Sequence, residues 1–408
     1  MRFENAFTLE LLGDAVLANG WFITGATGFI GREYVSRLLE RTDDTIFVLL
    51  RPGSKAGPSA RERLLASLNQ AQCAVRFDAS RLRVLQGDIT REGFGLGEDD
   101  IAVLRAHAIR MMHLAASTSF SRELSTARRI NVSGAQHVID FARHLRDHGR
   151  LVRLFHVSTA YVVGGRTGLV ECDDLDPHGS FRNTYERSKA EAESRMRAAA
   201  NELPITIFRP SIVVGDSRTG RSSGGNTVYW GLRRYLEGHR LFFARADASL
   251  DIVPVDYVVD AMMHIATNVR SPAPCYPLVA GRDGAITLGE FARAAADHYQ
   301  LSRPLLMSPV AFDRLLPMAR RLFRARQHRR FLRDMASYLP YFAANPHFSN
   351  APTDAALDGV LKCPPIQSYL PRIFAHCERQ GWATANGARP RLLGGFCDWW
   401  RERGVSTR

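Results

Sequence analysis

Short apolar runs alternate with helical stretches over the first half of the chain. The apolar runs have the length of buried strands, and the predicted strands are 21–24, 45–50, 83–86, 110–114, 151–157 and 204–208. The predicted helices lie between them at 29–41, 60–69, 99–107, 122–147 and 184–202. This alternation predicts the α/β class, with a doubly wound parallel sheet of Rossmann type and right-handed crossovers.

The pattern changes further along and divides the chain into three parts. Residues 1–19 form a short amphipathic lead-in, and residues 20–282 hold the alternating strands and helices. Within the latter, 211–250 is rich in glycine, serine and arginine and then aromatic, which predicts an excursion on the substrate side. Residues 283–408 are predicted to form a smaller, mostly helical C-terminal region that binds substrate or a partner.

The end of the excursion carries its own signals. Residues 251–255 are apolar after their first aspartate and predict a return to the sheet. Asp256 stands at the expected start of the next helix, where its carboxylate is expected to serve as the N-cap.

Composition narrows the class of protein. The chain has 408 residues, 45% of them hydrophobic, which is enough for a sizeable globular core. The six cysteines are scattered, without a Cys-x-x-Cys pair or a metal-type spacing, so free thiols and no metal site are expected. No run reaches the length of a membrane span, and the first twenty residues lack a signal pattern. These features predict a cytoplasmic protein.

Charge indicates the kind of partner. A net charge of +13 predicts attraction to phosphorylated cofactors, acidic carrier proteins or anionic membranes. The sequence resembles no nucleic-acid-binding motif, so nucleic acid is not an expected partner. Eight arginines lie between Arg314 and Arg333, interleaved with leucine and phenylalanine at roughly helical spacing. Three explanations stay open for this segment: a solvated helix face, a docking site for CoA or an anionic carrier, and a helix at the membrane periphery.

A glycine-rich turn follows the first predicted strand. The residues Gly-Ala-Thr-Gly-Phe-Ile-Gly occupy 25–31 and open the first helix. Gly25 permits a tight turn, Gly28 lets the backbone approach a pyrophosphate, and Gly31 lets the helix pack closely on the strand. The N-terminus of that helix offers free N–H groups to the phosphates. The turn therefore predicts a dinucleotide site, with Thr27, Phe29 and Ile30 among its contacts.

The second strand ends at a basic residue. Arg51 lies twenty residues after Gly31, where an acid would bind the ribose hydroxyls of NAD. A guanidinium there suits the 2′-phosphate of NADP instead, and Arg61 either completes the same clamp or is a solvated helix charge. Residues 20–282 are therefore predicted to be an NADP-binding Rossmann domain, with NADP(H) as the cofactor.

One of the chain's three lysines stands four residues after a tyrosine. Tyr185 and Lys189 fall on the same face of a predicted helix. A lysine ammonium can contact both a ribose and a phenol, and is expected to lower the pKa of the tyrosine toward the working pH. The pair predicts acid–base chemistry at Tyr185. The alternative is an exposed tyrosine beside a solvated lysine.

Two hydroxyls follow the fifth strand. Ser158 and Thr159 lie at its carboxyl end, where ligands bind in doubly wound sheets. A hydroxyl there can donate to a substrate carbonyl oxygen as negative charge develops. Thr159 is the favoured donor and Ser158 its competitor, although either side chain could simply cap the strand.

These residues carry a resemblance to a known family. The chain resembles the extended short-chain dehydrogenase/reductase superfamily over residues 20 to about 265. Within it, the chain is similar to the "male sterility" NAD(P)-binding branch, which holds fatty acyl-CoA reductases and thioester reductase domains. The residues that carry the likeness are the stretches 24–31, 87–89, 113–120, 157–161, 185–189 and 209–220.

The resemblance implies roles for further residues. It implies that Thr159, Tyr185 and Lys189 form a catalytic triad. It also implies that Asp88 and Ile89 flank the adenine and that Ala115 and Ala116 line the cofactor. Pro210 and Ile212 would border the nicotinamide. The C-terminal third resembles the branch only loosely.

The resulting expectation is an NADPH-dependent reductase of lipid metabolism. Its substrate would be an acyl thioester on CoA or an acyl carrier protein, reduced to an aldehyde or an alcohol with Tyr185 as proton donor. Two alternatives remain. One is a nucleotide-sugar epimerase or dehydratase, or a hydroxysteroid-type dehydrogenase, of the same superfamily. The other is a non-catalytic NADP sensor, against which the intact triad argues.

Overall fold

The structure is a computed structural model. It describes residues 18–53, 57–71, 78–222, 225–269, 273–312, 314, 338–341 and 345–382. Within these ranges, no helix is both long enough and apolar enough to cross a membrane. The arginine-rich segment lies outside the described residues except for Arg314, which is exposed.

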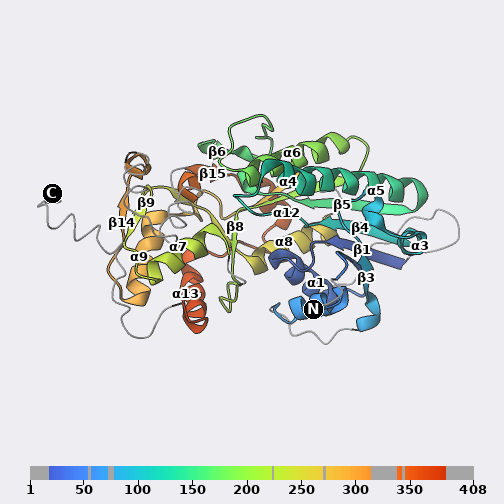
Figure 1. The fold of residues 1–408 in the computed structure, drawn as a ribbon, viewed down its shortest axis with the longest axis horizontal. Coiled ribbons are helices and arrows are strands. Elements are labelled where there is room, and N and C mark those ends of the chain that lie inside the picture. The colour runs from blue at the N-terminus through green and yellow to red at the C-terminus, as the bar shows by residue number, and fades with distance from the viewer. Residues whose placement is uncertain are drawn as a thin grey trace, which may run out of the picture.

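A seven-stranded parallel sheet forms the centre of the larger lobe (Figure 1). Its strands are β1 (Ala18–Thr24), β2 (Thr45–Leu50), β3 (Leu82–Gln86), β4 (His107–His113), β5 (Arg150–Val157), β7 (Ile205–Pro210) and β12 (Cys275–Leu278). Their order across the sheet is β12-β7-β5-β4-β1-β2-β3. This order reverses direction between β1 and β4, as in a Rossmann fold, and confirms the predicted fold class.

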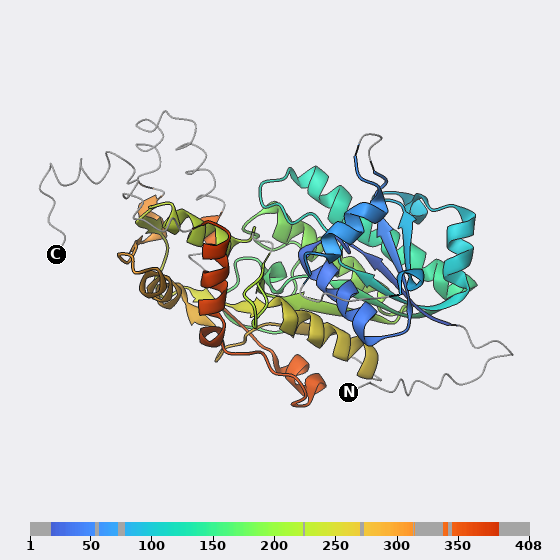
Figure 2. The same ribbon diagram turned by 90° about the horizontal axis from the view of Figure 1, so that it is seen from below.

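Helices cover both faces of this sheet (Figures 1 and 2). One face packs against α1 (Phe29–Arg41), α2 (Ala60–Leu68) and α8 (Val255–Asn268). The other packs against α3 (Glu98–Arg105), α5 (Gly134–His148) and α6 (Thr184–Ala199). The single helix predicted over 122–147 is instead α4 (Leu124–Arg128), a π-helical turn at Arg129–Ser133, and α5.

A smaller lobe lies beside the sheet, at the left in Figure 1. Its helices are α7 (Thr227–Leu236), α9 (Leu288–Tyr299) and α13 (Leu370–Arg379). They share one apolar core, in which Tyr229, Phe291 and Phe374 are all buried. The strands β9 (Leu241–Phe243) and β14 (Leu305–Met307) pair in parallel at its edge. Much of the predicted excursion therefore packs with segments from the C-terminal third of the chain.

Two expectations for the end of the excursion are wrong. The return strand β11 (Ile252–Pro254) pairs with β8 (Ile212–Val214) in a separate two-stranded sheet, and does not join the seven strands. Asp256 is inside α8 and does not cap it, because Pro254 holds the N-cap position. The Asp256 carboxylate instead accepts hydrogen bonds from the backbone N and the Oγ of Ser217, at 2.8 and 2.6 Å.

Short elements complete the fold. They are β6 (Gly168–Val170) paired with β15 (Pro346–Phe348), β10 (Ser249–Leu250) paired with β13 (Ile286–Thr287), α12 (Ala351–Leu357), and 3₁₀ turns at Ala79–Arg81, Glu92–Gly95, Ala160–Val163 and Ile366–Ser368. The four cysteines in the described ranges are free thiols, as expected, at positions 172, 275, 363 and 377.

Candidate active site

A large cavity lies at the carboxyl ends of the central strands. Its volume is about 1670 Å³, which exceeds the roughly 300–1,000 Å³ of typical small-molecule sites. The walls combine the glycine turn after β1, the loop after β4, the residues that follow β5, and the first turns of α6. Residues from the smaller lobe, including Asn226 and Tyr229, close the other side. The cavity has room for more than one small molecule.

The glycine turn has the geometry that its sequence predicts. Gly25 has a φ of +78°, and a Cβ placed on it would lie 2.5 Å from the backbone nitrogen of Ala115. A Cβ at Gly31 would lie 2.2 Å from the carbonyl oxygen of Gly25. Both positions therefore require glycine. Gly28 and Phe29 line the cavity, so the N-terminus of α1 faces it and can receive an anionic group.

Tyr185 and Lys189 both line the cavity from one face of α6. The helix begins where predicted, because the Asn183 side chain accepts a hydrogen bond from the backbone nitrogen of Glu186 at 2.9 Å. The Tyr185 ring stacks on Phe120 with a centroid distance of 5.8 Å. Helix geometry and capping thus fix both side chains at the cavity wall.

The expected effect of Lys189 on Tyr185 is wrong. Burial raises the pKa of Tyr185 to about 12, and a hydrogen bond with the Thr159 side chain offsets part of this rise. The Lys189 ammonium is engaged elsewhere, since Nζ donates to the carbonyl oxygen of Val157 at 2.8 Å. Tyr185 therefore keeps its proton at neutral pH, as a proton donor must.

Lys189 sits in a buried and mostly neutral environment. Its Nζ lies 3.4 Å from Nε2 of His156. Burial lowers the pKa of Lys189 to about 8, and the Glu193 carboxylate opposes this shift. Burial and then the nearby Lys189 lower the pKa of His113 to about 3 and that of His156 well below its usual value. Both histidines are thus neutral at pH 7.

The two hydroxyls after β5 have different partners. Ser158 Oγ donates to Glu193 Oε2 at 2.6 Å, and Glu193 pairs with Arg209 at 2.7 Å. Thr159 Oγ1 accepts from the backbone nitrogen of Tyr161 at 3.3 Å, and its side chain is hydrogen-bonded to Tyr185. Both residues line the cavity, but only Thr159 is joined to the predicted proton donor.

The structure brings most of the predicted residues to this cavity. The predicted residues that line it are Gly25, Gly28, Phe29, Ile30, Ala116, Thr159, Tyr185, Lys189, Pro210 and Ile212. The predicted residues outside its lining are Thr27, Arg51, Arg61, Asp88, Ile89 and Ala115. Five of this second group follow the carboxyl ends of the adjacent parallel strands β1, β2, β3 and β4, on the same side of the sheet as the cavity, whereas Arg61 lies in α2.

The two arginines predicted to select the cofactor are both exposed. Arg51 directly follows β2, and Arg61 lies in α2. The Arg63 guanidinium donates to the Arg51 carbonyl oxygen, so α2 is tied to the end of β2. Sequence reasoning did not single out Arg63. After β3, the Asp88 carboxylate accepts from the backbone nitrogen of Thr90 at 2.8 Å.

An aromatic wall beside Tyr185 was missed by the sequence analysis. The rings of Phe120 and Tyr341 stack at 5.1 Å with an interplanar angle of 7°. The Arg182 guanidinium lies over Tyr341, 4.6 Å from the ring centroid, and pairs with Glu186 at 3.0 Å. Phe120 sits in the loop after β4, so its strand-end position was a usable signal. Tyr341 is distant in sequence and gave none.

Comparison with known proteins identifies the family. Residues 23–262 match the family model described as male sterility protein, which is more than half of the chain. The chain belongs to this family. As a male sterility family member it is an oxidoreductase with the extended short-chain dehydrogenase/reductase architecture, whose Rossmann domain binds a nicotinamide cofactor.

Relatives of two kinds share this family resemblance. A fatty acyl-CoA reductase of Drosophila melanogaster is 28% identical over 308 residues, which cover 66% of this chain and 58% of that protein. A non-canonical nonribosomal peptide synthetase of Aspergillus campestris is 31% identical over 272 residues, covering 63% of this chain and 25% of that protein. This male sterility family chain therefore corresponds to only part of each relative.

Solved structures match almost the whole chain, as one example shows. The terminal R domain from the myxalamid PKS-NRPS biosynthetic pathway is 26% identical and superposes with a TM-score of 0.76. The match covers 91% of this chain and 93% of that domain. The similarity therefore extends past the male sterility family match into the smaller lobe.

Proposed function

We propose that the protein reduces an acyl thioester, carried on CoA or an acyl carrier protein, with NADPH as the reductant. The observation that carries this proposal is the meeting of Thr159, Tyr185 and Lys189 at one cavity wall, next to the glycine turn. The related fatty acyl-CoA reductase and the peptide synthetase support an acyl group on a thiol carrier.

The residues of the cavity fit a dinucleotide. Gly25 and Gly31 leave no room for a side chain, so the turn lies close against α1 and the loop after β4. The N-terminus of α1 would hold the pyrophosphate, and Lys189 would hold the nicotinamide ribose. Arg51 would pair with the 2′-phosphate that distinguishes NADPH from NADH. When bound, the cofactor supplies the hydride that reduces the carbonyl carbon.

The protein's own groups would act on the carbonyl oxygen. Thr159 donates a hydrogen bond to this oxygen as negative charge develops on it. Tyr185 then gives its phenolic proton to the same oxygen, which yields a neutral hemithioacetal. Breaking the carbon–sulfur bond and reprotonating the sulfur releases an aldehyde and the free thiol of the carrier. A second hydride and proton would convert the aldehyde to an alcohol.

The test is a measurement of stoichiometry. Purified protein is mixed with NADPH and an acyl-CoA, and NADPH loss at 340 nm is compared with free thiol released. We expect one NADPH per thiol for an aldehyde product and two for an alcohol. The same assay with an acyl-loaded carrier protein compares the two carriers. NADPH binding without any turnover of thioesters would instead favour a sensor, and turnover of nucleotide sugars alone would favour an epimerase or dehydratase.

A further inference from the structure

Four side chains form a stacked row that ends at Tyr185. The Arg182 guanidinium lies over the ring of Tyr341, 4.6 Å from its centroid. Tyr341 and Phe120 stack at 5.1 Å with an interplanar angle of 7°. Phe120 stacks in turn on Tyr185, at 5.8 Å with an interplanar angle of 28°. Because rings and cations attract one another only in particular arrangements, the row favours one position of the Tyr185 ring.

The first turn of α6 closes this stacked row into a ring of contacts. Asn183, the N-cap of α6, donates from Nδ2 to the Tyr341 hydroxyl at 3.0 Å. Glu186, in the same turn, pairs with Arg182 at 3.0 Å, and both side chains of this ion pair are buried. Tyr341 is therefore joined to the helix that carries Tyr185 by its hydroxyl and, through Arg182, by its ring face.

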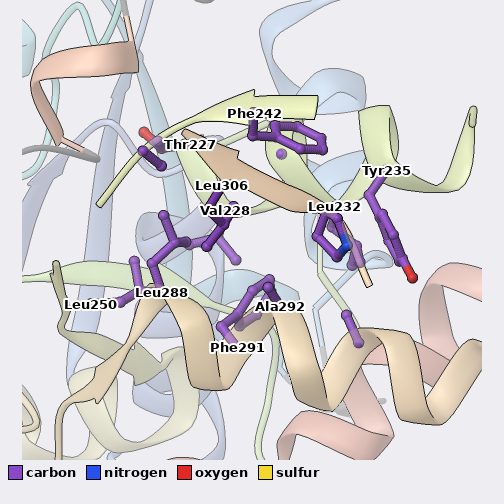
Figure 3. Close-up of a pocket in the computed structure, with 14 residues that line it drawn as sticks. Thr227, Val228, Leu232, Tyr235, Phe242, Leu250, Leu288, Phe291, Ala292 and Leu306 are labelled. Carbon is purple, nitrogen blue, oxygen red and sulfur yellow. The ribbon is translucent and has the colours of Figure 1, made fainter. Parts of the chain in front are cut away.

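Tyr338 ties the stacked row to the smaller lobe. Its ring lies 5.6 Å from that of Phe120 and 4.7 Å from that of Trp230 in α7. By its spacing, Trp230 is on the opposite side of α7 from Val228 and Leu232. Figure 3 shows these two residues on the side of α7 that faces α9, where they belong to the buried core of the smaller lobe. The helix that contacts Tyr338 is therefore held in place by that core.

We propose that Tyr341 is a positioning residue, which holds Phe120 and through it the Tyr185 ring, so that the Tyr185 hydroxyl meets the substrate carbonyl oxygen. The inference rests on the proposed function, in which Tyr185 is the proton donor. It adds a residue from the C-terminal third, outside the family match that ends at residue 262. A proton donor has to lie within hydrogen-bonding distance of its acceptor, and a misplacement of about 1 Å lowers the rate on the order of 10²-fold.

The experiment compares substitutions of Tyr341 in the full chain, with an acyl-CoA and NADPH as substrates. Tyr341→Leu removes the ring that stacks on Phe120, so kcat should fall about tenfold or more. Tyr341→Phe keeps the ring and loses only the hydroxyl, so its kcat should stay within about threefold of the wild type. The Kd for NADPH and the KM for acyl-CoA should change by less than about twofold in both variants. Phe120→Leu interrupts the same row and should reproduce the kcat loss if Tyr341→Leu fails to fold.

Phe348→Leu is the matched control. Phe348 and Tyr341 are both buried, and each ring contacts the Tyr161 ring edge-on at 5.3 Å. Leucine at either position therefore leaves a similar gap beside Tyr161. Phe348 is not part of the stacked row and does not line the large cavity. Phe348→Leu should lower the free energy of unfolding about as much as Tyr341→Leu does, while its kcat stays within about twofold of the wild type.

A solvent isotope effect separates positioning from a general loosening of the fold. A misplaced Tyr185 slows proton transfer, so the effect of D₂O on kcat should be larger in Tyr341→Leu than in the wild type or Phe348→Leu. Normal kcat in Tyr341→Leu or Phe120→Leu, equal kcat losses in Tyr341→Leu and Phe348→Leu, or a loss confined to the KM for acyl-CoA would overturn the role of Tyr341. Absence of thioester reduction by the wild type would instead refute the proposed function.

Discussion

Ser158 donates its hydroxyl hydrogen bond to Glu193 at an Oγ–Oε2 distance of 2.6 Å, in the interior of the protein. Glu193 is fully buried, and although burial opposes it, pairing with Arg209 holds the pKa of Glu193 below its usual value. The Ser158 proton is therefore held by a buried carboxylate. The hydroxyl of the next residue, Thr159, is joined to Tyr185 instead.

We expect substitutions of these two neighbours to differ in their effect on kcat, which only the Thr159 change should lower strongly. Thr159→Val removes a hydroxyl that stabilises negative charge at the carbonyl oxygen, so kcat should fall by roughly 10²-fold. It also removes the acceptor of the Tyr161 backbone N–H, so the free energy of unfolding should fall by about 1–3 kcal/mol. Ser158→Ala removes a hydrogen bond to a buried carboxylate and should lower the free energy of unfolding by about 1–3 kcal/mol. Steady-state kinetics distinguish the two, and urea unfolding measures both losses of stability. A large kcat loss in Ser158→Ala at unchanged stability would reverse the assignment.

Removing the Tyr185 hydroxyl should stop proton donation without disturbing the fold. Tyr185→Phe should lower kcat by roughly 10²-fold or more while the Kd for NADPH stays nearly constant. Tyr34→Phe is the matched control, because the buried Tyr34 hydroxyl has no hydrogen-bond partner among the residues that the structure describes. Near-normal turnover of an acyl thioester by Tyr185→Phe would exclude Tyr185 as the donor.

The protonation of Lys189 should set an alkaline limit to activity. Its pKa is lowered to about 8 by burial, so the ammonium that holds the ribose is lost above that pH. The kcat/KM for NADPH reports the free enzyme and should decline above about pH 8. Lys189→Arg should be less active at every pH but should lack this decline, because a guanidinium stays charged. A flat wild-type profile to pH 9.5 would contradict this prediction.

Deprotonation of Lys189 should raise the stability of the fold, although it lowers activity. The folded pKa of Lys189 is about 8, whereas an unfolded lysine titrates near about 10.4. Between these values the unfolded state binds more protons, so the Lys189 contribution to stability rises with pH. Below pH 8 the cost of burying the charge is fully present. In urea unfolding, the free energy of unfolding of the wild type relative to that of Lys189→Met should be higher at pH 9.5 than at pH 7.5. An equal difference at the two pH values would contradict this expectation.

Arg51 should select NADPH over NADH. A charge-assisted bond to the 2′-phosphate contributes on the order of 1.5–3 kcal/mol. Arg51→Ala should therefore raise the KM for NADPH by about tenfold or more and leave the KM for NADH nearly unchanged. Arg61→Ala tests the second arginine of the predicted clamp. Equal losses with both cofactors in Arg51→Ala would show that this residue does not read the phosphate.

The sequence predicted the elements whose signals are local. Six of the seven sheet strands carry an apolar run between turn signals, and all six were found. The missed strand, β12, has four residues and contains Pro277, which argues against a strand in the middle of a sheet. It is tolerated because β12 lies at the edge of the sheet.

The parts of the site that escaped prediction depend on tertiary contacts. Spacing alone placed Tyr185 and Lys189 on one helix face. The direction of the Tyr185 pKa shift depends on burial, which spacing does not reveal. Similarly, the stacking of Tyr341 on Phe120 joins residues more than 200 positions apart. Asp256 has the usual chemistry of an N-cap, but it binds Ser217 from a different segment.

The core shared by α7, α9 and α13 determines how the protein can be divided. A fragment that ends at residue 262, where the family match ends, would keep α7 but lose its packing partners Phe291 and Phe374. It would also lose β12, so that β7 would become an unprotected sheet edge. Such a fragment should aggregate. The smallest soluble piece therefore has to continue at least through α13, well past the boundary that sequence similarity suggests.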